Sequence, residues 1–472
     1  MRLFLPGVAL CISAISYLPC SAGAQPAALP TAPPAEKAPS FTPLQNATQD
    51  KDAIAPANST SMAAQPPGTE LSLADAEARA LKNQPRLLAE QYRAQAAIKR
   101  IGEPRASYSA QAYGNLTAIE ANGDTAVAAG ALTTSSISTR AAGGASLVQM
   151  ITDFGHTSNL VQSARLAAKA SGQDEESIRQ SILMQVEEAY FNAQAAESVR
   201  KTALAVLDFR RVTLRQLSAL AQSELRSTLD VQFAQVMDSE AELALVRAES
   251  NVQRAHAQLA AAMGEEGDSD YILADEPLPA NPEADPAGYI SAAIADRPDL
   301  KALKLRSDSA MHEARAERDR NYPTVNALAA GGEVPIHDPT IHHEYGAVGA
   351  NINVPLFNGG LYAARSAAAK LEARAADKDA VLREVEIVRD VRMTWADARD
   401  AYLQIGVSQR LVDETNVAMR LAKARYDAGL GSIVELNQAE LDQTSALITA
   451  ASARFDYLRA MTAFQFAMGD VH

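Results

Sequence analysis

The chain contains an internal duplication, which constrains its fold more strongly than any other feature of the sequence. When the sequence is moved along itself by 205 residues, related segments coincide over a long stretch without a gap. Trp395 falls on Tyr190, and Met468–Asp470 falls on Met263–Glu265. Each copy predicts the same element order, which is helix, strand, strand, long helix, long helix. We therefore expect one architecture built from two equivalent halves.

Two segments at the start of the chain are expected to lie outside these halves. Residues 1–24 have the charged start, the apolar core and the small-residue end of a secretory signal peptide. Residues 25–68 are rich in Pro, Ala, Ser and Thr, which predicts a flexible N-terminal arm. The first structural repeat is then expected over residues 69–280 and the second over residues 281–472, each with two strands and a long helical hairpin.

The composition limits the classes of function that fit the chain. Its two cysteines, Cys11 and Cys20, both fall in the expected signal peptide, so the mature chain offers no thiol chemistry. Pro19 occupies a position where a lipoprotein signal needs a small residue, which argues against lipidation of Cys20. The formal net charge of -14 argues against nucleic acid as a partner. The mature sequence has no run of 18 apolar residues, so any membrane role would fall to strands.

Four segments have the alternating pattern of strands, namely Tyr108–Ala118, Ala141–Ile151, Thr324–Gly332 and Tyr345–Leu356. In the last of them, apolar side chains project to one face while Asn351 and Asn353 project to the other. This pattern fits transmembrane strands, although four strands of a soluble sandwich have it too. Because four strands cannot close a barrel, several chains would have to share one sheet if these strands span a membrane.

The remaining long segments predict coiled-coil hairpins. Leu361–Ala428 contains no proline, and as a helix it would extend roughly 100 Å. The helix expected from Ser432 onwards has apolar residues at seven-residue spacing, as does its equivalent in the first half. These residues are Val434, Leu441, Ile448 and Phe455, and in the first half Leu229, Val236 and Leu243. We expect these stripes to pack the hairpins, with another face of the helices in water.

A strand passes abruptly into a helix at the segment "NINVPLFNGG", Asn351–Gly360. Proline fixes φ and glycine permits an unusual turn, so this segment suits a stiff linker between a strand and a helix. The duplication places a second such linker in the first half, where side-chain capping of the helix is also expected. The residues assigned to the two linkers are Pro355, Asn358, Gly359, Gly360, Asp153 and Gly155, with Asn358 and Asp153 as N-caps or near-caps.

The duplication, "VPLFNGG" after the fourth strand and "YDAGLGSIVELNQAE" (Tyr426–Glu440) together resemble the TolC family of outer-membrane efflux and secretion channels. The resemblance covers about Leu71 to Asp470. It implies a mainly α fold with a membrane β-barrel contribution, in which a homotrimer shares one twelve-stranded barrel in outer-membrane lipid. A periplasmic α-helical coiled-coil barrel continues the strands.

The same resemblance implies a function. The chain would be the passive exit duct of a tripartite efflux pump or a type I secretion system, with no cofactor. A periplasmic adaptor, the membrane fusion protein, would open the duct at its hairpin tips and link it to an inner-membrane transporter. The tip residues expected to contact the adaptor are Leu225, Ser227, Gly429, Leu430, Gly431 and Ser432.

The resemblance also implies a closed periplasmic entrance, in which Tyr426, Glu435 and Asp230 match gate positions of the family. Two positions depart from the family pattern. Gly431 replaces the expected arginine, and Gln438 replaces the expected second acid. A trimer would therefore present one acidic ring, from Glu435, and this predicts cation-selective conductance that Glu435→Gln weakens.

Arg226 falls on Gly431 when the halves are superimposed. The gate arginine is therefore hypothesised to have moved to the first hairpin, where it would reach Glu435 or Asp427. The alternative is a solvated arginine of little energetic consequence, because exposed ion pairs contribute only about 0–1 kcal/mol.

Two other classes of protein were weighed. A periplasmic coiled-coil adaptor or scaffold would share the heptads but should have one helical hairpin beside a compact β-rich domain. A metal-binding surface protein would use His337, His342 and His343 in the loop between the third and fourth strands. Such loops are more often polar surface, so no metal is expected. The sequence contains no recognisable catalytic set, and we do not expect an enzyme.

Overall fold

The computed structural model describes residues 69–120, 128–129, 132–133, 140–265, 271–336 and 342–470. These residues belong to one compact unit, residues 65–472. No helix among the described residues is long and apolar enough to cross a membrane.

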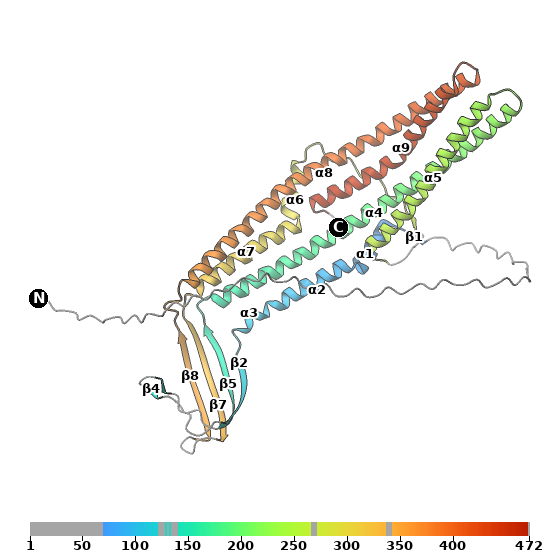
Figure 1. The fold of residues 1–472 in the computed structure, drawn as a ribbon. Coiled ribbons are helices and arrows are strands. Elements are labelled where there is room, and N and C mark those ends of the chain that lie inside the picture. Colours follow the sequence, from blue (N-terminus) through green and yellow to red (C-terminus); the bar gives the residue numbers. More distant parts are fainter. Residues whose placement is uncertain are drawn as a thin grey trace, which may run out of the picture. The chain divides into compact units, whose positions relative to one another are not determined.

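The first half contains short helices, strands and one long hairpin (Figure 1). In chain order these elements are β1 (Thr69–Leu71), α1 (Leu73–Asn83), α2 (Pro85–Arg100), α3 (Gly102–Ala106), β2 (Gln111–Ile119), β3 (Ala128–Ala129), β4 (Leu132–Thr133), β5 (Arg140–Thr152), α4 (His156–Gln222) and α5 (Thr228–Met263).

The second half repeats this order, except that it has no counterpart of α3, β3 or β4 among the described residues. Its elements are β6 (Tyr271–Leu273), α6 (Ala287–Asp296), α7 (Pro298–Asp319), β7 (Thr324–Ile336), β8 (Glu344–Asn353), α8 (Leu361–Asp427) and α9 (Ile433–Met468). The long helices α4 and α8 have 67 residues each, and the returning helices α5 and α9 have 36 residues each. The duplicated element order is thereby confirmed.

Three strand ends differ from the prediction by three residues or more. The strand expected over Thr324–Gly332 continues to Ile336. The strand expected over Tyr345–Leu356 ends at Asn353, because Pro355 has no N–H to donate to a sheet. The strand expected from Tyr108 begins at Gln111. The three residues before that strand belong instead to the turn that ends α3, where the Ser109 amide donates to the Ala106 carbonyl at 2.9 Å.

The four longer strands form one antiparallel sheet in the order β2-β5-β7-β8. At the centre of the sheet, β5 of the first half pairs with β7 of the second half. Strands β2 and β8 are the two edges, and neither pairs with a further strand among the described residues. Every residue of β8 is exposed, including Val348 at 90% and Ile352 at 64%. The sheet therefore leaves unpaired edges and apolar surface uncovered in the single chain.

The duplication extends to the contacts that hold the helices in place. The Tyr190 hydroxyl donates to the carbonyls of Leu71 and Ala274, at 2.9 and 2.8 Å. In the second half, the indole N–H of Trp395 donates to the Glu283 carbonyl at 2.9 Å. These two aromatic residues coincide in the duplication, and each ties a long helix to the connection between the two halves, at Ala274 and Glu283.

The heptad prediction was wrong about which stripe packs the first hairpin. The buried residues of α5 are mostly alanines at seven-residue spacing, namely Ala234, Ala241, Ala248 and Ala255. The larger apolar stripe is exposed, with Leu229 at 57%, Val236 at 51% and Leu243 at 49%. Alanine lets helices approach closely, so the small residues form the seam within the chain and the large ones face outward. In α9, Val434 and Leu441 are likewise exposed, whereas Phe455 is buried.

Candidate functional site

The candidate functional site consists of the two hairpin turns, which lie at the ends of the hairpins away from the sheet (Figure 1). The two turns have a similar backbone conformation. Glu224 and Gly429 adopt left-handed conformations, with φ of 57° and 72°. Ser227 and Ser432 then cap the returning helices, because their hydroxyls accept from the amides of Leu229 and Glu435. The sequence assigned both serines to adaptor contact, and the structure shows that their side chains also fix the turns.

Tyr426 and Asp230 join the two tips directly. The Tyr426 hydroxyl donates to Asp230 Oδ2 at 2.5 Å, across 196 residues of sequence. The Tyr426 side chain is buried in a small cluster that includes Leu217, Ala234 and Ile433. Burial, together with the hydrogen bond to the Asp230 carboxylate, raises the pKa of Tyr426. The phenol therefore stays protonated and keeps its donor role.

Arg226 crosses from the first tip to the second, but it does not meet a carboxylate there. Its guanidinium lies 4.3 Å from the centroid of the Tyr426 ring. One nitrogen donates to the carbonyls of Tyr426 and Asp427, at 3.1 and 3.4 Å. The hypothesis that Arg226 reaches the other hairpin agrees with this geometry, while the expected pairing with the side chain of Glu435 or Asp427 is not present. A cation–π contact and two carbonyls hold the arginine instead.

Glu435 has a different partner, which the sequence did not indicate. Arg425 Nε lies 3.1 Å from Glu435 Oε1, and both side chains are about half exposed. Gln438 points to its own helix neighbour, donating to Asp442 at 2.9 Å. The charge of the expected acidic ring is thus partly balanced by Arg425 within the same hairpin.

Gly431, which stands where an arginine was expected, is closely surrounded by Arg425 and Glu435. A Cβ atom added there would lie 3.2 Å from both Arg425 Cβ and Glu435 Oε2. These separations are tighter than ordinary van der Waals contact, so a side chain at this position would require Arg425 and Glu435 to shift by a few tenths of an ångström. The absence of a side chain at Gly431 therefore leaves the space in which Arg425 and Glu435 pair.

A buried ion pair lies further along the hairpins, away from the turns. Arg210 on α4 pairs with Glu440 on α9, and both side chains are 5% exposed. Burial lowers the pKa of Arg210. The sequence does not indicate this pair, because its members lie 230 residues apart on different hairpins and no periodic pattern connects them. Breaking one member would leave an uncompensated buried charge.

Two exposed leucines complete the tips. Leu225 and Leu430 are 70% and 75% exposed, and they coincide in the duplication. Their exposure gives each tip one large apolar side chain free to contact another protein.

The linkers between strands and long helices have the predicted backbone. Phe154 and Gly155 have positive φ in the first half, and Gly359 and Gly360 have it in the second. Asp153 is buried and accepts from the amides of Gly155 and Thr157, at 3.3 and 2.7 Å. It thus caps α4 as expected.

Asn358 does not cap α8 with its side chain, and this prediction was wrong. Gly360 is the N-cap residue, and no side chain bonds the helix at that position. Asn358 contributes its backbone carbonyl, which accepts from the Leu361 amide at 3.3 Å. Pro355 lies between the end of β8 and this turn.

The histidine loop falls only partly within the described residues. His337 lies outside them, while His342 is exposed and precedes β8. Among the described residues, no three His, Cys, Asp or Glu side chains come together in a group that could hold a metal ion.

Comparison with known proteins identifies the family. The family model described as outer membrane efflux protein matches residues 77–265 and 289–470. The alkaline protease secretion protein AprF of Pseudomonas aeruginosa is 27% identical over 192 residues, 39% of this chain and 40% of AprF. Protein CyaE of Bordetella pertussis is 25% identical over 301 residues, 62% of this chain and 63% of CyaE. The matches thus span less than two thirds of either relative.

A solved structure has the same fold. The outer membrane protein VceC of Vibrio cholerae superimposes with a TM-score of 0.73 at 18% identity, covering 84% of this chain and 96% of VceC. The two matched segments of the family model coincide with the two halves of the fold. The chain therefore belongs to the outer membrane efflux protein family, a family of outer-membrane channels with a long periplasmic helical part.

Proposed function

We propose that this protein is the outer-membrane exit duct of a tripartite efflux pump or a type I secretion system. The observation that carries this proposal is the open sheet. Strands β2 and β8 leave both edges unpaired among the described residues, and β8 is exposed along its whole length. Such a sheet is completed by strands of other chains. Three chains with four strands each would form one twelve-stranded barrel in outer-membrane lipid.

The exposed heptad stripes support the trimer. Leu229, Val236 and Leu243 recur every seven residues along α5, and about half of each side chain is exposed in the part of the chain that the structure describes. Seven-residue spacing of large apolar residues is typical of helices that pack against another helix. In the proposed trimer these stripes contact neighbouring protomers, and the helices of three chains surround one periplasmic tunnel.

The tips form the proposed closed entrance. The bond from Tyr426 to Asp230 and the position of Arg226 hold the second hairpin against the first. Opening requires these contacts to break, and a periplasmic adaptor would supply the binding energy. The exposed Leu225 and Leu430 are the proposed apolar anchors for that adaptor. Energy for transport would come from an inner-membrane transporter, so the duct itself needs no cofactor and no catalytic residue.

The alternative of a periplasmic adaptor is less consistent with the fold. An adaptor was expected to have one helical hairpin beside a compact β-rich domain. This chain has two long hairpins and an open sheet.

The experiment that tests the proposal measures assembly and insertion together. The full chain, exported and purified from membranes in detergent, should have the mass of a trimer and should permeabilise liposomes to small solutes. Leu225→Ser combined with Leu430→Ser should leave both properties unchanged while abolishing export in cells. A monomer that stays in the soluble periplasmic fraction would overturn the proposal.

A further inference from the structure

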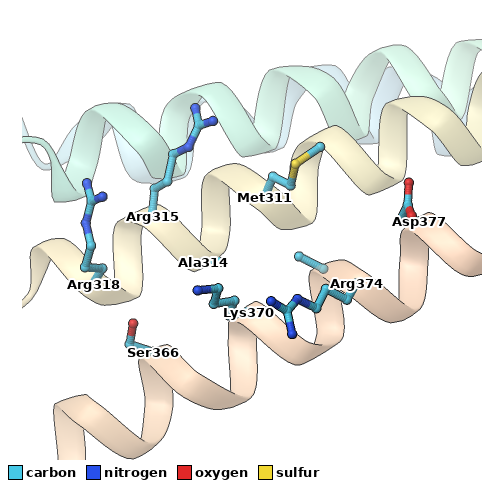
Figure 2. A pocket seen from close by; sticks show the side chains of 9 residues that line it. Met311, Ala314, Arg315, Arg318, Ser366, Lys370, Arg374 and Asp377 are labelled. Carbon is cyan, nitrogen blue, oxygen red and sulfur yellow. The ribbon is translucent and has the colours of Figure 1, made fainter.

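A cavity between α7 and α8 has four cationic side chains among the nine residues that line it (Figure 2). Its volume is about 470 Å³. Arg315 and Arg318 come from α7, and Lys370 and Arg374 come from α8. In Figure 2, Lys370 and Arg374 lie between the two helices. A concentration of positive charge at one site is unexpected in a chain with a formal net charge of -14.

Most of these cations have no carboxylate partner. Within the part of the chain that the structure describes, neither Arg315, Lys370 nor Arg374 takes part in an ion pair or a side-chain hydrogen bond. Arg318 pairs with Asp319, and the cavity's acid, Asp377, lies 3.0 Å from Lys378. Lys370 and Arg374 lie between α7 and α8, whereas the Arg315 side chain extends from α7 away from α8 (Figure 2). The two unpaired cations between the helices create a local positive potential that an anion would neutralise.

The cavity begins close to the point where the sheet joins the helices. Arg318 comes shortly before β7, which starts at Thr324, and Ser366 comes shortly after α8 begins at Leu361. At 1.5 Å per residue, Ser366 lies about 8 Å along α8 and Lys370 about 14 Å. The linker that leads into α8 exposes Leu356 and Phe357 at 92% and 91%. An apolar surface therefore precedes the cationic cavity along the chain.

We propose that this cavity binds the phosphate of an anionic phospholipid in the periplasmic leaflet of the outer membrane. The inference rests on the outer-membrane location and on the proposed role of the strands as the membrane-spanning part. Headgroups extend about 5–8 Å beyond the hydrocarbon layer on each side. Long basic side chains hold their charge several ångströms from the backbone, so those on the periplasmic side of this layer can extend back to the headgroups. Arg318, Ser366 and Lys370 line the membrane-proximal part of the cavity, while Arg374 strengthens the potential behind them.

The cationic side chains of the cavity favour an anionic lipid over a neutral one. Guanidinium groups donate paired hydrogen bonds to phosphate oxygens, and basic pockets beside a membrane attract anionic headgroups. A phosphatidylglycerol headgroup carries a net negative charge, whereas phosphatidylethanolamine carries none. The exposed Leu356 and Phe357 offer a surface for the acyl chains of the bound lipid.

The test measures lipid retention on the delipidated full-length protein in detergent by native mass spectrometry. Phosphatidylglycerol, phosphatidylethanolamine and inorganic phosphate are offered separately. The wild type should retain phosphatidylglycerol in preference to phosphatidylethanolamine and should not bind millimolar phosphate. Lys370→Gln with Arg374→Gln should weaken phosphatidylglycerol binding roughly 30-fold, as expected for two cations beside a headgroup. The control Arg365→Gln with Arg392→Gln removes two exposed charges from the same helix outside the cavity, and it should change binding less than threefold.

Three outcomes would overturn the inference. They are equal retention of the two lipids, equal loss in the control variant, and inorganic phosphate that binds as tightly as the lipid. The last outcome would identify a site for soluble anions. Because binding is measured without ion flow, a protein that shows the lipid preference but does not conduct would contradict the proposed duct alone.

Discussion

The Arg226 guanidinium lies over the ring of Tyr426, 4.3 Å from its centroid, although the two residues belong to different hairpins. The same tyrosine donates a hydrogen bond to Asp230, so three side chains connect the two tips. The first tip thus supplies an arginine at the position equivalent to Gly431 of the second tip.

Removing the Arg226 guanidinium should make the closed duct leak. Arg226→Ala removes a cation–π contact, which contributes about 0.5–1 kcal/mol at an exposed site. Passive conductance through the purified channel should rise about two- to fivefold. Arg226→Lys keeps the charge but loses the planar donor, and an intermediate conductance is expected. Arg215→Ala, on α4 before the turn that contains Arg226, serves as the control. An Arg226→Ala channel that leaks no more than the wild type would show that Arg226 is not part of the closure.

Charge selectivity should depend on Glu435 and Arg425 in opposite directions. The pair is half exposed, so it contributes little to stability and mainly balances charge at the entrance. Glu435→Gln should reduce the preference for cations, and Arg425→Gln should increase it. The measurement is the reversal potential in a potassium chloride gradient, and the double variant should return close to the wild-type value. If neither single variant shifts the potential, other groups set the selectivity.

Substitution of the left-handed residue should have opposite effects on the stability of the two turns. Glu224 has φ 57° without being glycine, while Gly429 has φ 72° at the equivalent position. A left-handed conformation costs a side-chain-bearing residue about 1 kcal/mol or more. Gly429→Ala should therefore speed amide hydrogen exchange in the adjoining turns of α8 and α9 about fivefold. Glu224→Gly should slow exchange in the first tip or leave it unchanged. Slower exchange in Gly429→Ala would contradict the assigned turn geometry.

Stability should fall as the pH rises through neutrality because of Glu77 on α1. Burial, with smaller contributions from the carboxylates of Glu187 and Glu276, raises the pKa of Glu77 from 4.5 to about 7. The folded chain binds this proton more tightly than the unfolded chain, so the stabilisation is complete below about pH 4.5 and is lost towards pH 7. Glu77→Gln should unfold at a higher temperature than the wild type at pH 8, with little difference at pH 5. The exposed control Glu249→Gln should not change this profile.

Much of the fold could be predicted from the sequence because the duplication provides two copies of each signal. The positive φ at Phe154 and Gly155 follows from aligning them with Gly359 and Gly360. The heptads were harder to interpret, since α5 has two seven-residue stripes and the pattern favours the larger side chains. Ala234 and its equivalents are buried instead, because small residues allow the helices of one hairpin to approach closely.

The candidate site could be predicted only in outline. Tyr426 and Asp230 were placed at the gate, and the structure brings them together. The partner of Glu435 was missed, because Arg425 lies across a tight turn that does not follow the helical period. Asn358 and Asp153 were both expected as N-caps or near-caps, and both lie three residues before their helix, but only the Asp153 side chain accepts from amides of the helix start.

The most direct test of the proposed duct is the single-channel conductance of the wild-type trimer in a planar bilayer, beside Tyr426→Phe combined with Arg226→Ala. The phenylalanine removes the hydrogen bond to Asp230, and the alanine removes the cation that lies over the ring. We expect small, stable, cation-selective openings for the wild type and a severalfold larger conductance for the double variant. A protein that never inserts, or a double variant with unchanged conductance, would contradict a duct closed at its hairpin tips.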